Sequence, residues 1–184
     1  MMKVKIYLSN LRKYTEGNEN GKWLQLPMES ERLHTIFNAI VGKNEEWIIL
    51  DSDAPFFVSE YNDIFELNDL LKNFNESGID DTTVKIVCRV SDTKEEALEK
   101  LKSGRYTIVD VDDVSYGWSC ALSSEELYGM VLNEIGYNNL FEESIPDDMV
   151  DYINFEQVWV ALSVADGWQA VIINNETYLV TTNF

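Results

Sequence analysis

Basic side chains are missing from almost half of this sequence. Residues 106–184 contain neither lysine nor arginine, although the same stretch holds fourteen aspartates and glutamates. Its formal charge is therefore −14, whereas residues 1–105 carry −5, because nineteen carboxylates there face all fourteen basic side chains. A net charge of −19 lowers the stability of a compact chain through self-repulsion. A surface this acidic therefore calls for a functional reason.

The sequence also lacks a long apolar run and a targeting segment. No stretch approaches the roughly 20 apolar residues of a transmembrane helix, and charges interrupt residues 1–14, which excludes a secretory signal. The cysteines, Cys88 and Cys120, match no redox or metal-binding spacing, so we interpret them as buried thiols in a reducing compartment. We therefore expect a cytoplasmic protein that binds no membrane. Its excess of acidic groups also argues against binding to nucleic acid.

Motifs for catalysis and for cofactors are absent as well. His34 is the only histidine, no serine or cysteine lies in a G-x-S-x-G motif, and there is no phosphate-binding loop. Asp110, Asp112 and Asp113 resemble the start of a calcium loop. The glycine of such a loop is missing, however, and Ala121 stands where its closing glutamate belongs. We expect no enzymatic activity, no cofactor and no bound metal.

Residues 1–61 have the pattern of a small α+β unit. Three strands are predicted from alternating or β-rich runs, over residues 3–9, 22–28 and 46–51. Residues 10–21, with two glycines, predict a long polar loop. Residues 29–42 predict a helix that Ser30 caps and that ends at Gly42 in a left-handed conformation.

Residues 62–104 are predicted to be mainly helical. Residues 62–74 have apolar residues at helical spacing, with carboxylates on the opposite face. Residues 91–104 predict a second helix that ends at a glycine. Residues 83–90 are ambiguous, because their β-branched side chains favour a strand while the segments on both sides favour helices.

Residues 105–184 predict a second α+β unit. Residues 108–111 predict a short strand, and residues 123–136 predict a helix with capping-box spacing at its start. A further helix is predicted from Pro146 to Trp159, because proline is favoured in the first turn. The β-rich runs on either side of Asn174-Asn175 predict a type I′ hairpin.

The chain is thus predicted to be an elongated α+β protein of three small tandem domains. These are an N-terminal three-stranded sheet with a helix (1–61), a helical middle domain (62–104) and an acidic α+β domain with a terminal hairpin (105–184).

The acidic groups are concentrated in two blocks. Residues 44–81 carry −10 and residues 106–184 carry −14, whereas residues 1–43 and 82–105 are net positive. A solubilising surface is the simplest interpretation of such groups. The alternative is mimicry of nucleic acid, since duplex DNA carries one charge per about 1.7 Å and nineteen excess charges match on the order of 30 Å of duplex.

The carboxylates of the two blocks form the candidate interaction surface. Its members are Asp63, Glu66, Asp69, Asp80, Asp81, Asp110, Asp112, Asp113, Glu125, Glu126, Glu134, Glu142, Glu143, Asp147, Asp148, Asp151 and Glu156.

Three segments carry a more specific signal through their order and spacing. Residues 6–27 read IYLSNLRKYTEGNENGKWLQLP, residues 54–71 read APFFVSEYNDIFELNDLL, and residues 133–157 read NEIGYNNLFEESIPDDMVDYINFEQ. Together they resemble the ArdA antirestriction proteins of plasmids and conjugative transposons. The third segment resembles the antirestriction motif of that family. The residues at its motif positions, which form a candidate dimer region, are Gly136, Pro146, Tyr152, Ile153 and Phe155. The chain departs from the family pattern after this segment, where many members have a Gly-Arg-Asp run.

The resemblance implies an elongated homodimer of three-domain subunits whose acidic surface imitates bent B-form DNA. Such proteins occupy the DNA-binding groove of type I restriction–modification enzymes, on the methyltransferase core, and protect incoming mobile DNA. Because subunits of that family join through the C-terminal domain, the lysine-free segments of two chains are expected near the two-fold axis.

Two other functions stay open from the residues alone. An acidic immunity or regulatory protein would cap a single nuclease or other DNA-binding protein through a compact interface with a few dominant side chains. A carboxylate-dependent hydrolase would need an acid with a raised pKa in a cavity, and the sequence gives no sign of one.

Overall fold

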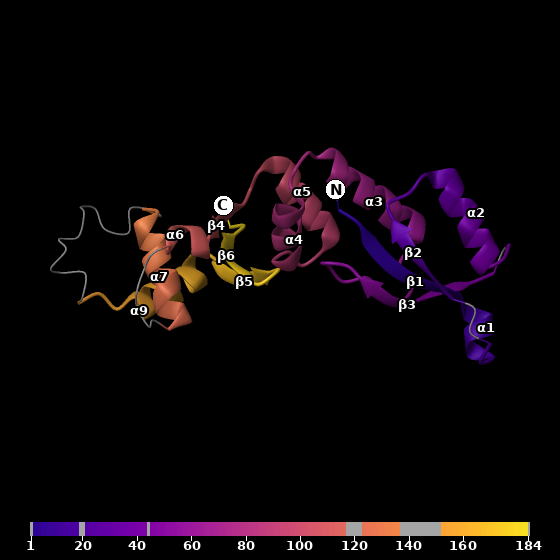
Figure 1. Ribbon diagram of the computed structural model, residues 1–184, viewed down its shortest axis with the longest axis horizontal. Helices are drawn as coiled ribbons and strands as arrows, with labels where there is room; N and C mark the ends of the chain where they lie inside the picture. The colour runs from indigo at the N-terminus through magenta and orange to yellow at the C-terminus, as the bar shows by residue number, and fades with distance from the viewer. Residues whose placement is uncertain (1, 19–20, 44, 117–122, 137–151, 184) are drawn as a thin grey trace. The chain divides into compact units, whose positions relative to one another are not determined.

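A computed structural model describes residues 2–18, 21–43, 45–116, 123–136 and 152–183 of the chain. The chain divides into two compact units, Met1–Ser103 and Gly104–Phe184 (Figure 1). Each unit contains a three-stranded antiparallel sheet with helices, which confirms the α+β prediction. The separation of residues 1–61 from residues 62–104 as two domains stays a prediction.

The sheet of the first unit has the strand order β2-β1-β3. β1 (Val4–Asn10) lies in the centre and pairs antiparallel with β2 (Lys22–Leu26) and β3 (Trp47–Asp53). All three predicted strands are confirmed. The alternation in β1 directs Ile6 and Leu8 into the core, where neither is exposed to solvent.

Two helices, α2 (Ser30–Ile40) and α3 (Ile64–Glu76), cover one face of this sheet (Figure 1). Gly42 has a φ of +101°, which confirms the predicted left-handed residue after α2. The prediction of Ser30 as the N-cap was wrong. Ser30 is the first helical residue, and Glu29 occupies the cap without a side-chain hydrogen bond to the helix.

Two asparagines attach α3 to the sheet. The amide of Asn68 accepts a hydrogen bond from the Met28 N–H (2.8 Å) and donates one to the Met28 carbonyl (3.1 Å). Asn75 makes the same pair of hydrogen bonds to Met2, at 2.6 and 3.1 Å. The two asparagines are two helical turns apart and therefore share one face of α3. They satisfy backbone groups at the start of β1 and just beyond the end of β2.

A short helix, α1 (Leu11–Thr15), replaces the first part of the predicted loop 10–21. The prediction of a continuous loop was wrong because Asn10 caps this helix. The Asn10 side chain accepts a hydrogen bond from the Lys13 N–H at 2.8 Å and donates one to the Val41 carbonyl. A buried asparagine thus joins the end of β1, the start of α1 and the end of α2.

The ambiguous segment 83–90 is helical. α4 (Asp81–Arg89) buries Val84, Val87 and Cys88, which recur at helical spacing. Tertiary packing of this face therefore outweighs the preference of its β-branched residues for a strand. The next predicted helix is confirmed as α5 (Lys94–Ser103).

The sheet of the second unit has the strand order β4-β6-β5. It consists of β4 (Thr107–Asp110), β5 (Gln169–Ile173) and β6 (Glu176–Thr181). Asn174 and Asn175 connect β5 to β6 with φ values of 53° and 69°, which confirms the type I′ turn.

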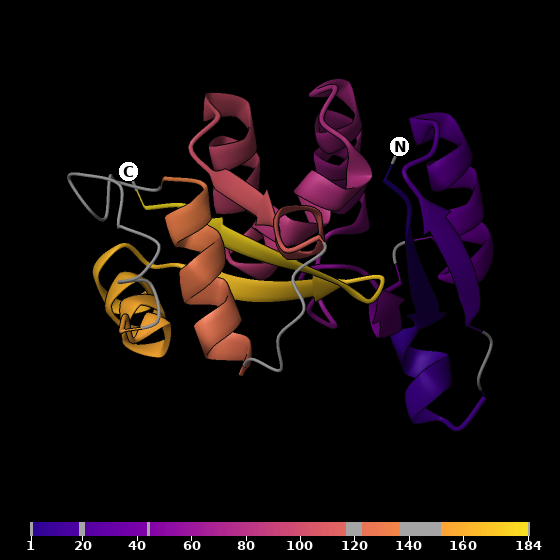
Figure 2. The same ribbon diagram turned by 60° about the vertical axis from the view of Figure 1, so that its left-hand side comes forward.

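Helices α6 (Val111–Val114), α7 (Ser124–Glu134) and α9 (Phe155–Ala165) complete the described part of the second unit. Figure 2 shows α7 lying across the strands of the terminal hairpin. The core between helices and sheet consists of Val109, Val111, Val131, Leu132, Leu162, Trp168 and Leu179. No helix within the described ranges has both the length and the apolar character of a membrane span.

Two predictions for this unit were wrong. Val111 does not extend the strand, because the Asp110 side chain caps α6 directly after β4. The helix predicted from Pro146 to Trp159 does not include Ile153, because Asn154 is the N-cap of α9 and accepts a hydrogen bond from the Gln157 N–H at 3.0 Å. Residues 146–151 of that prediction lie outside the described residues.

Gly129 brings α7 into close contact with the start of α9. A Cβ at this position would overlap the carbonyl oxygen of Phe155 and lie 2.8 Å from its carbonyl carbon. The two backbones touch, so no side chain fits between them. The first turn of α9 is therefore fixed by a glycine in α7.

We predict that Gly129→Ala destabilises the second unit. In an ordinary helix this change stabilises by about 1 kcal/mol, but here the added methyl group forces α9 away from α7. Thermal unfolding followed by circular dichroism should show a loss of about 5–10 °C. Ser124→Ala, an exposed position in the same helix, should leave the transition almost unchanged. A higher transition temperature for Gly129→Ala would contradict the contact.

Candidate functional site

Twelve of the seventeen predicted surface carboxylates fall within the described residues, and none of the twelve is buried. Eight are exposed, namely Glu66, Asp69, Asp80, Asp112, Asp113, Glu125, Glu134 and Glu156. Four are half-buried, namely Asp63, Asp81, Asp110 and Glu126. The other five, Glu142, Glu143, Asp147, Asp148 and Asp151, lie outside the described residues. The described carboxylates are thus available to a partner.

Acidic groups of the first unit have basic neighbours. Ion pairs among the described residues include Arg12–Glu16, Asp69–Lys72, Lys94–Glu95 and Glu96–Lys100, with N–O distances of 3.0, 3.1, 4.0 and 2.7 Å. All four join residues close in sequence. A hydrogen bond from Lys100 lowers the pKa of the Glu96 carboxyl. Part of the negative charge of this unit is therefore balanced locally, although such exposed pairs contribute little to stability.

The second unit has almost no basic groups, since Arg105 is the only arginine or lysine in residues 104–184. Its carboxylates gather at helix N-termini instead. Asp110 caps α6 and accepts hydrogen bonds from the N–H groups of Asp112 (3.0 Å) and Asp113 (3.2 Å). The partial positive charge at the start of a helix stabilises anions there by about 0.3–1 kcal/mol each.

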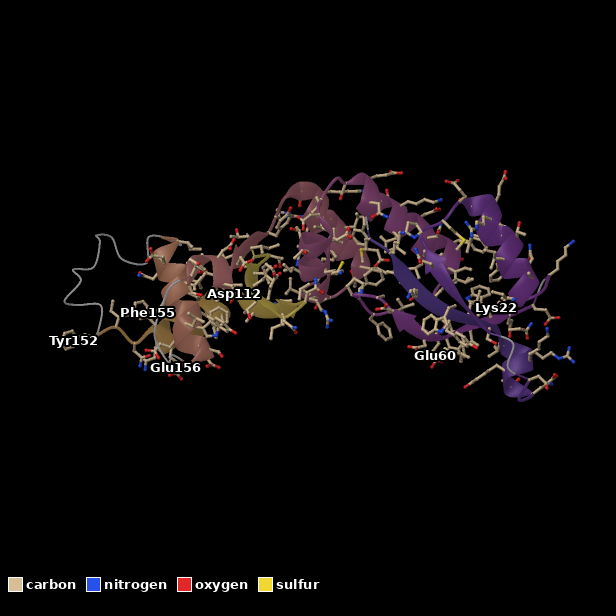
Figure 3. The ribbon with its side chains drawn as sticks, in the orientation of Figure 1. Lys22, Glu60, Asp112, Tyr152, Phe155 and Glu156 are labelled. Carbon is tan, nitrogen blue, oxygen red and sulfur yellow. The ribbon has the colours of Figure 1, made fainter. Side chains whose placement is uncertain are left out.

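The same arrangement recurs in α7 and α9. Ser123 caps α7 by accepting a hydrogen bond from the Glu126 N–H at 3.2 Å, and Glu125 and Glu126 occupy the first turn. Glu156 lies in the first turn of α9 (Figure 3). Six of the nine described carboxylates in this unit are thus located at helix N-termini.

A tyrosine hydroxyl stabilises another carboxylate of the second unit. Tyr178 donates a hydrogen bond to Glu176 Oε2 at 2.7 Å. This hydrogen bond raises the pKa of Tyr178 to about 12, and the nearby charge of Asp110 acts in the same direction. The phenol therefore stays protonated and serves as a neutral donor to Glu176.

The described residues of the motif region differ in exposure. Tyr152 is 83% exposed, whereas Phe155 is 4% exposed and contributes to the packing of α9 against α7 (Figure 3). Ile153 is half-buried, and Gly136 follows α7 with a φ of +67°. Pro146 lies outside the described residues. Tyr152 is therefore the described motif side chain best placed to meet a partner.

The described side chains that were considered for catalysis or metal binding do not form a site. Within the described ranges, no group of three or more His, Cys, Asp or Glu side chains is placed to hold a metal ion. His34 stacks on Phe65 with a centroid distance of 4.3 Å. Burial raises the pKa of the Cys88 thiol to about 12, so it stays protonated and is a weak nucleophile.

Sequence reasoning missed two groups of exposed apolar side chains. Val160 and Val164, on the outer face of α9, are 52% and 82% exposed. Phe57 and Tyr61, between β3 and α3, are 85% and 66% exposed. The i,i+4 spacing of the two valines was a usable signal. The two aromatic residues fall in the segment 54–71, but nothing in their pattern distinguished an exposed ring from a buried one.

Asp80 links the acidic surface to the stability of the first unit. Its carboxylate caps α4 by accepting a hydrogen bond from the Thr83 N–H at 2.9 Å. This hydrogen bond lowers the pKa of the Asp80 carboxyl. The ionised form is thus stabilised in the folded state relative to the unfolded chain, whose aspartates have a pKa of about 4.

We predict that Asp80→Ala lowers the free energy of unfolding by about 1 kcal/mol at neutral pH. The contribution of the carboxylate is fully present above the unfolded pKa and is lost as the pH falls through the lowered folded pKa. Denaturant unfolding at several pH values should show the difference from the parent narrowing below about pH 4. Asp80→Asn keeps an oxygen acceptor, so it should cost less. A difference of constant size into strong acid would argue against the cap.

Comparison with known proteins identifies the chain. No curated protein sequence matches it. The family model described as Antirestriction protein (ArdA) matches residues 6–170, well over half of the chain. The matched range contains all seventeen predicted surface carboxylates and spans both compact units. The resemblance seen in the sequence is thereby confirmed: the chain belongs to the ArdA family of antirestriction proteins.

Proposed function

We propose that this protein inhibits type I restriction–modification enzymes by occupying the DNA-binding groove of their methyltransferase core. Membership of an antirestriction family supports the biological role. The observation that carries the mechanism is the second unit, in which nine described carboxylates accompany one basic residue. Such a surface repels phosphates and attracts the lysine and arginine side chains with which an enzyme holds DNA.

The arrangement of these carboxylates suits binding that is distributed over many weak contacts. The described members of the candidate surface extend over α3, α4, α6, α7 and α9, and none is buried. A basic groove that binds DNA releases counterions from it, and an acidic protein in the same groove would have an equally salt-dependent affinity. The inhibitor acts in the cytoplasm, stoichiometrically and without catalysis of its own.

A homodimer is part of this proposal. The outer face of α9 exposes Val160, Ala161 and Val164, a stripe of small apolar residues without charge. Small side chains allow two helices to approach closely, and two acidic chains can meet at an apolar face without strong repulsion. We infer that two copies associate through this stripe.

We predict that the protein inhibits DNA cleavage by a purified type I enzyme in proportion to its molar ratio. Inhibition should weaken steeply as salt is raised from about 50 to 200 mM, because the interface is electrostatic. Cleavage assays and titration calorimetry on the methyltransferase measure both effects. Full cleavage at low salt with excess protein would rule out the proposed function.

Charge-neutralising variants in the same assay separate mimicry from a compact immunity-type interface. Single changes such as Asp112→Asn or Glu125→Gln should each weaken binding by less than about fivefold, the range of one surface ion pair. One or two substitutions that each cost more than about thirtyfold would instead indicate a few dominant side chains.

We predict that Val164→Glu shifts the protein towards monomers, since the new carboxylate would be buried against the same stripe of a second chain. Sedimentation equilibrium measures the change. Ile172→Glu is a matched control, because Ile172 is 66% exposed in the same unit but lies on β5. Equal oligomeric states for the parent and Val164→Glu would contradict an interface on α9.

A further inference from the structure

Two adjoining cavities lie beside β3 in the first unit. One, of about 430 Å³, lies between Ile49–Ser52 of β3 and residues 57–61. The other, of about 280 Å³, is lined by Leu11, Glu46, Trp47 and Tyr61. Tyr61 lines both cavities. Together we call them the β3 groove.

The side chains of the β3 groove have a consistent chemistry. Its titratable and aromatic lining consists of the carboxylates Glu46, Asp51 and Glu60 and the rings of Trp47, Phe57 and Tyr61. No lysine or arginine lines either cavity. The surrounding sequence continues this pattern, since residues 45–71 contain eight carboxylates and no basic residue. The groove is therefore complementary to a positively charged group, although Phe57 also lines a third cavity whose lining includes Arg89 and Lys94.

The aromatic rings of the β3 groove are available to a partner. Phe57 is 85% exposed and Tyr61 is 66% exposed, so neither side chain fills the core of the unit. Exposed rings of this size on one short segment are the residue types that dominate protein interfaces. Their faces carry a negative quadrupole, which attracts a guanidinium or ammonium group placed above them.

The segment that carries these side chains is held in place by hydrogen bonds. The Ser59 N–H donates to Asn62 Oδ1 at 2.7 Å, and the Trp47 indole donates to the Asn62 carbonyl at 3.2 Å. The Ile49 N–H donates to the Glu60 carbonyl at 2.9 Å, which fixes Glu60 beside β3 (Figure 3). A partner would therefore meet an ordered surface and lose little affinity to ordering it.

A partner would be recognised in the β3 groove through side chains, and not by adding a strand to the edge of the sheet at β3. The Ile49 N–H is already bonded to the Glu60 carbonyl, and the Ser52 N–H donates to Asp51 Oδ1 at 2.8 Å. Both amides would otherwise be free to pair with an added strand. With them occupied, the carboxylates and rings provide the contacts.

We propose that the β3 groove binds an arginine-bearing polypeptide segment of a protein partner. The guanidinium would lie over Phe57 or Tyr61 and pair with Glu60 or Asp51. Arginine is favoured over lysine, because its planar group stacks on aromatic rings and pairs with carboxylates through two hydrogen bonds. If the proposed function is correct, that partner is the restriction enzyme itself. The first unit then adds a localised contact to the distributed charge of the second.

A direct test uses the full chain and a blocked tripeptide, N-acetyl-Gly-Arg-Gly-amide, without any enzyme. Titration followed by amide chemical shifts should perturb residues 49–52 and 57–61 more than residues 110–113 and 124–126. The double variant Phe57→Leu/Tyr61→Leu should lose this selectivity, whereas Tyr61→Phe should retain it. Perturbations that simply follow all carboxylates would overturn the proposal. Equally tight binding of free guanidinium would also overturn it, by indicating a small-cation site.

A second measurement uses the intact type I methyltransferase. The double variant should bind on the order of tenfold more weakly than the parent, with an unchanged dependence on salt, because the number of charges is the same. Thermal unfolding should not change, since both rings are exposed. If the parent binds the enzyme and the double variant binds equally well, the enzyme does not use the groove. If the parent does not bind the enzyme at all, the proposed function fails. The tripeptide titration then still shows whether the β3 groove binds arginine.

Discussion

The second unit has to fold a dense set of carboxylates with one basic residue to balance them. Six of its nine described carboxylates lie at helix N-termini, where unpaired N–H groups and the helix dipole act as partial positive charges. Asp110 shows the principle most directly, since it both ends β4 and caps α6. The positions of the acidic groups and the starts of the helices are therefore coupled in this unit, because the same side chains form its surface and cap its helices.

In the first unit, basic side chains balance part of the acidic charge, and asparagine amides connect strands to helices. Its helices carry lysine and arginine one turn from their acidic partners, and Asn10, Asn68 and Asn75 join strands to helices through neutral hydrogen bonds. Neutral connections keep the fold independent of the charge on its surface. The unit can consequently present the carboxylates of Glu60 and Asp51 beside exposed rings at the β3 groove, where Asp51 also accepts a hydrogen bond from the Ser52 N–H.

Patterns with a short physical range could be read from the sequence. The alternation in β1, the type I′ turn at Asn174-Asn175 and the left-handed Gly42 each depend on neighbouring residues, and each was predicted. Side-chain caps were harder. Asn10 starts a helix where polar residues and two glycines suggested a loop, and Asn154 starts one where apolar periodicity suggested the interior of a longer helix. The acidic surface was predicted from composition, but its coincidence with helix starts, the bare face of α9 and the exposed rings depend on tertiary packing.

The lack of lysine in the second unit also determines how the protein can be observed. Trypsin has no site after Arg105, so digestion leaves residues 106–184 as a single fragment of 79 residues. Amine-directed cross-linkers likewise label only the first unit and report a complex as though the second were absent. Reagents that couple to carboxylates reach both units, because residues 1–105 hold nineteen acidic side chains and residues 106–184 hold fourteen. Footprints of the second unit in any complex will therefore depend on carboxylate chemistry.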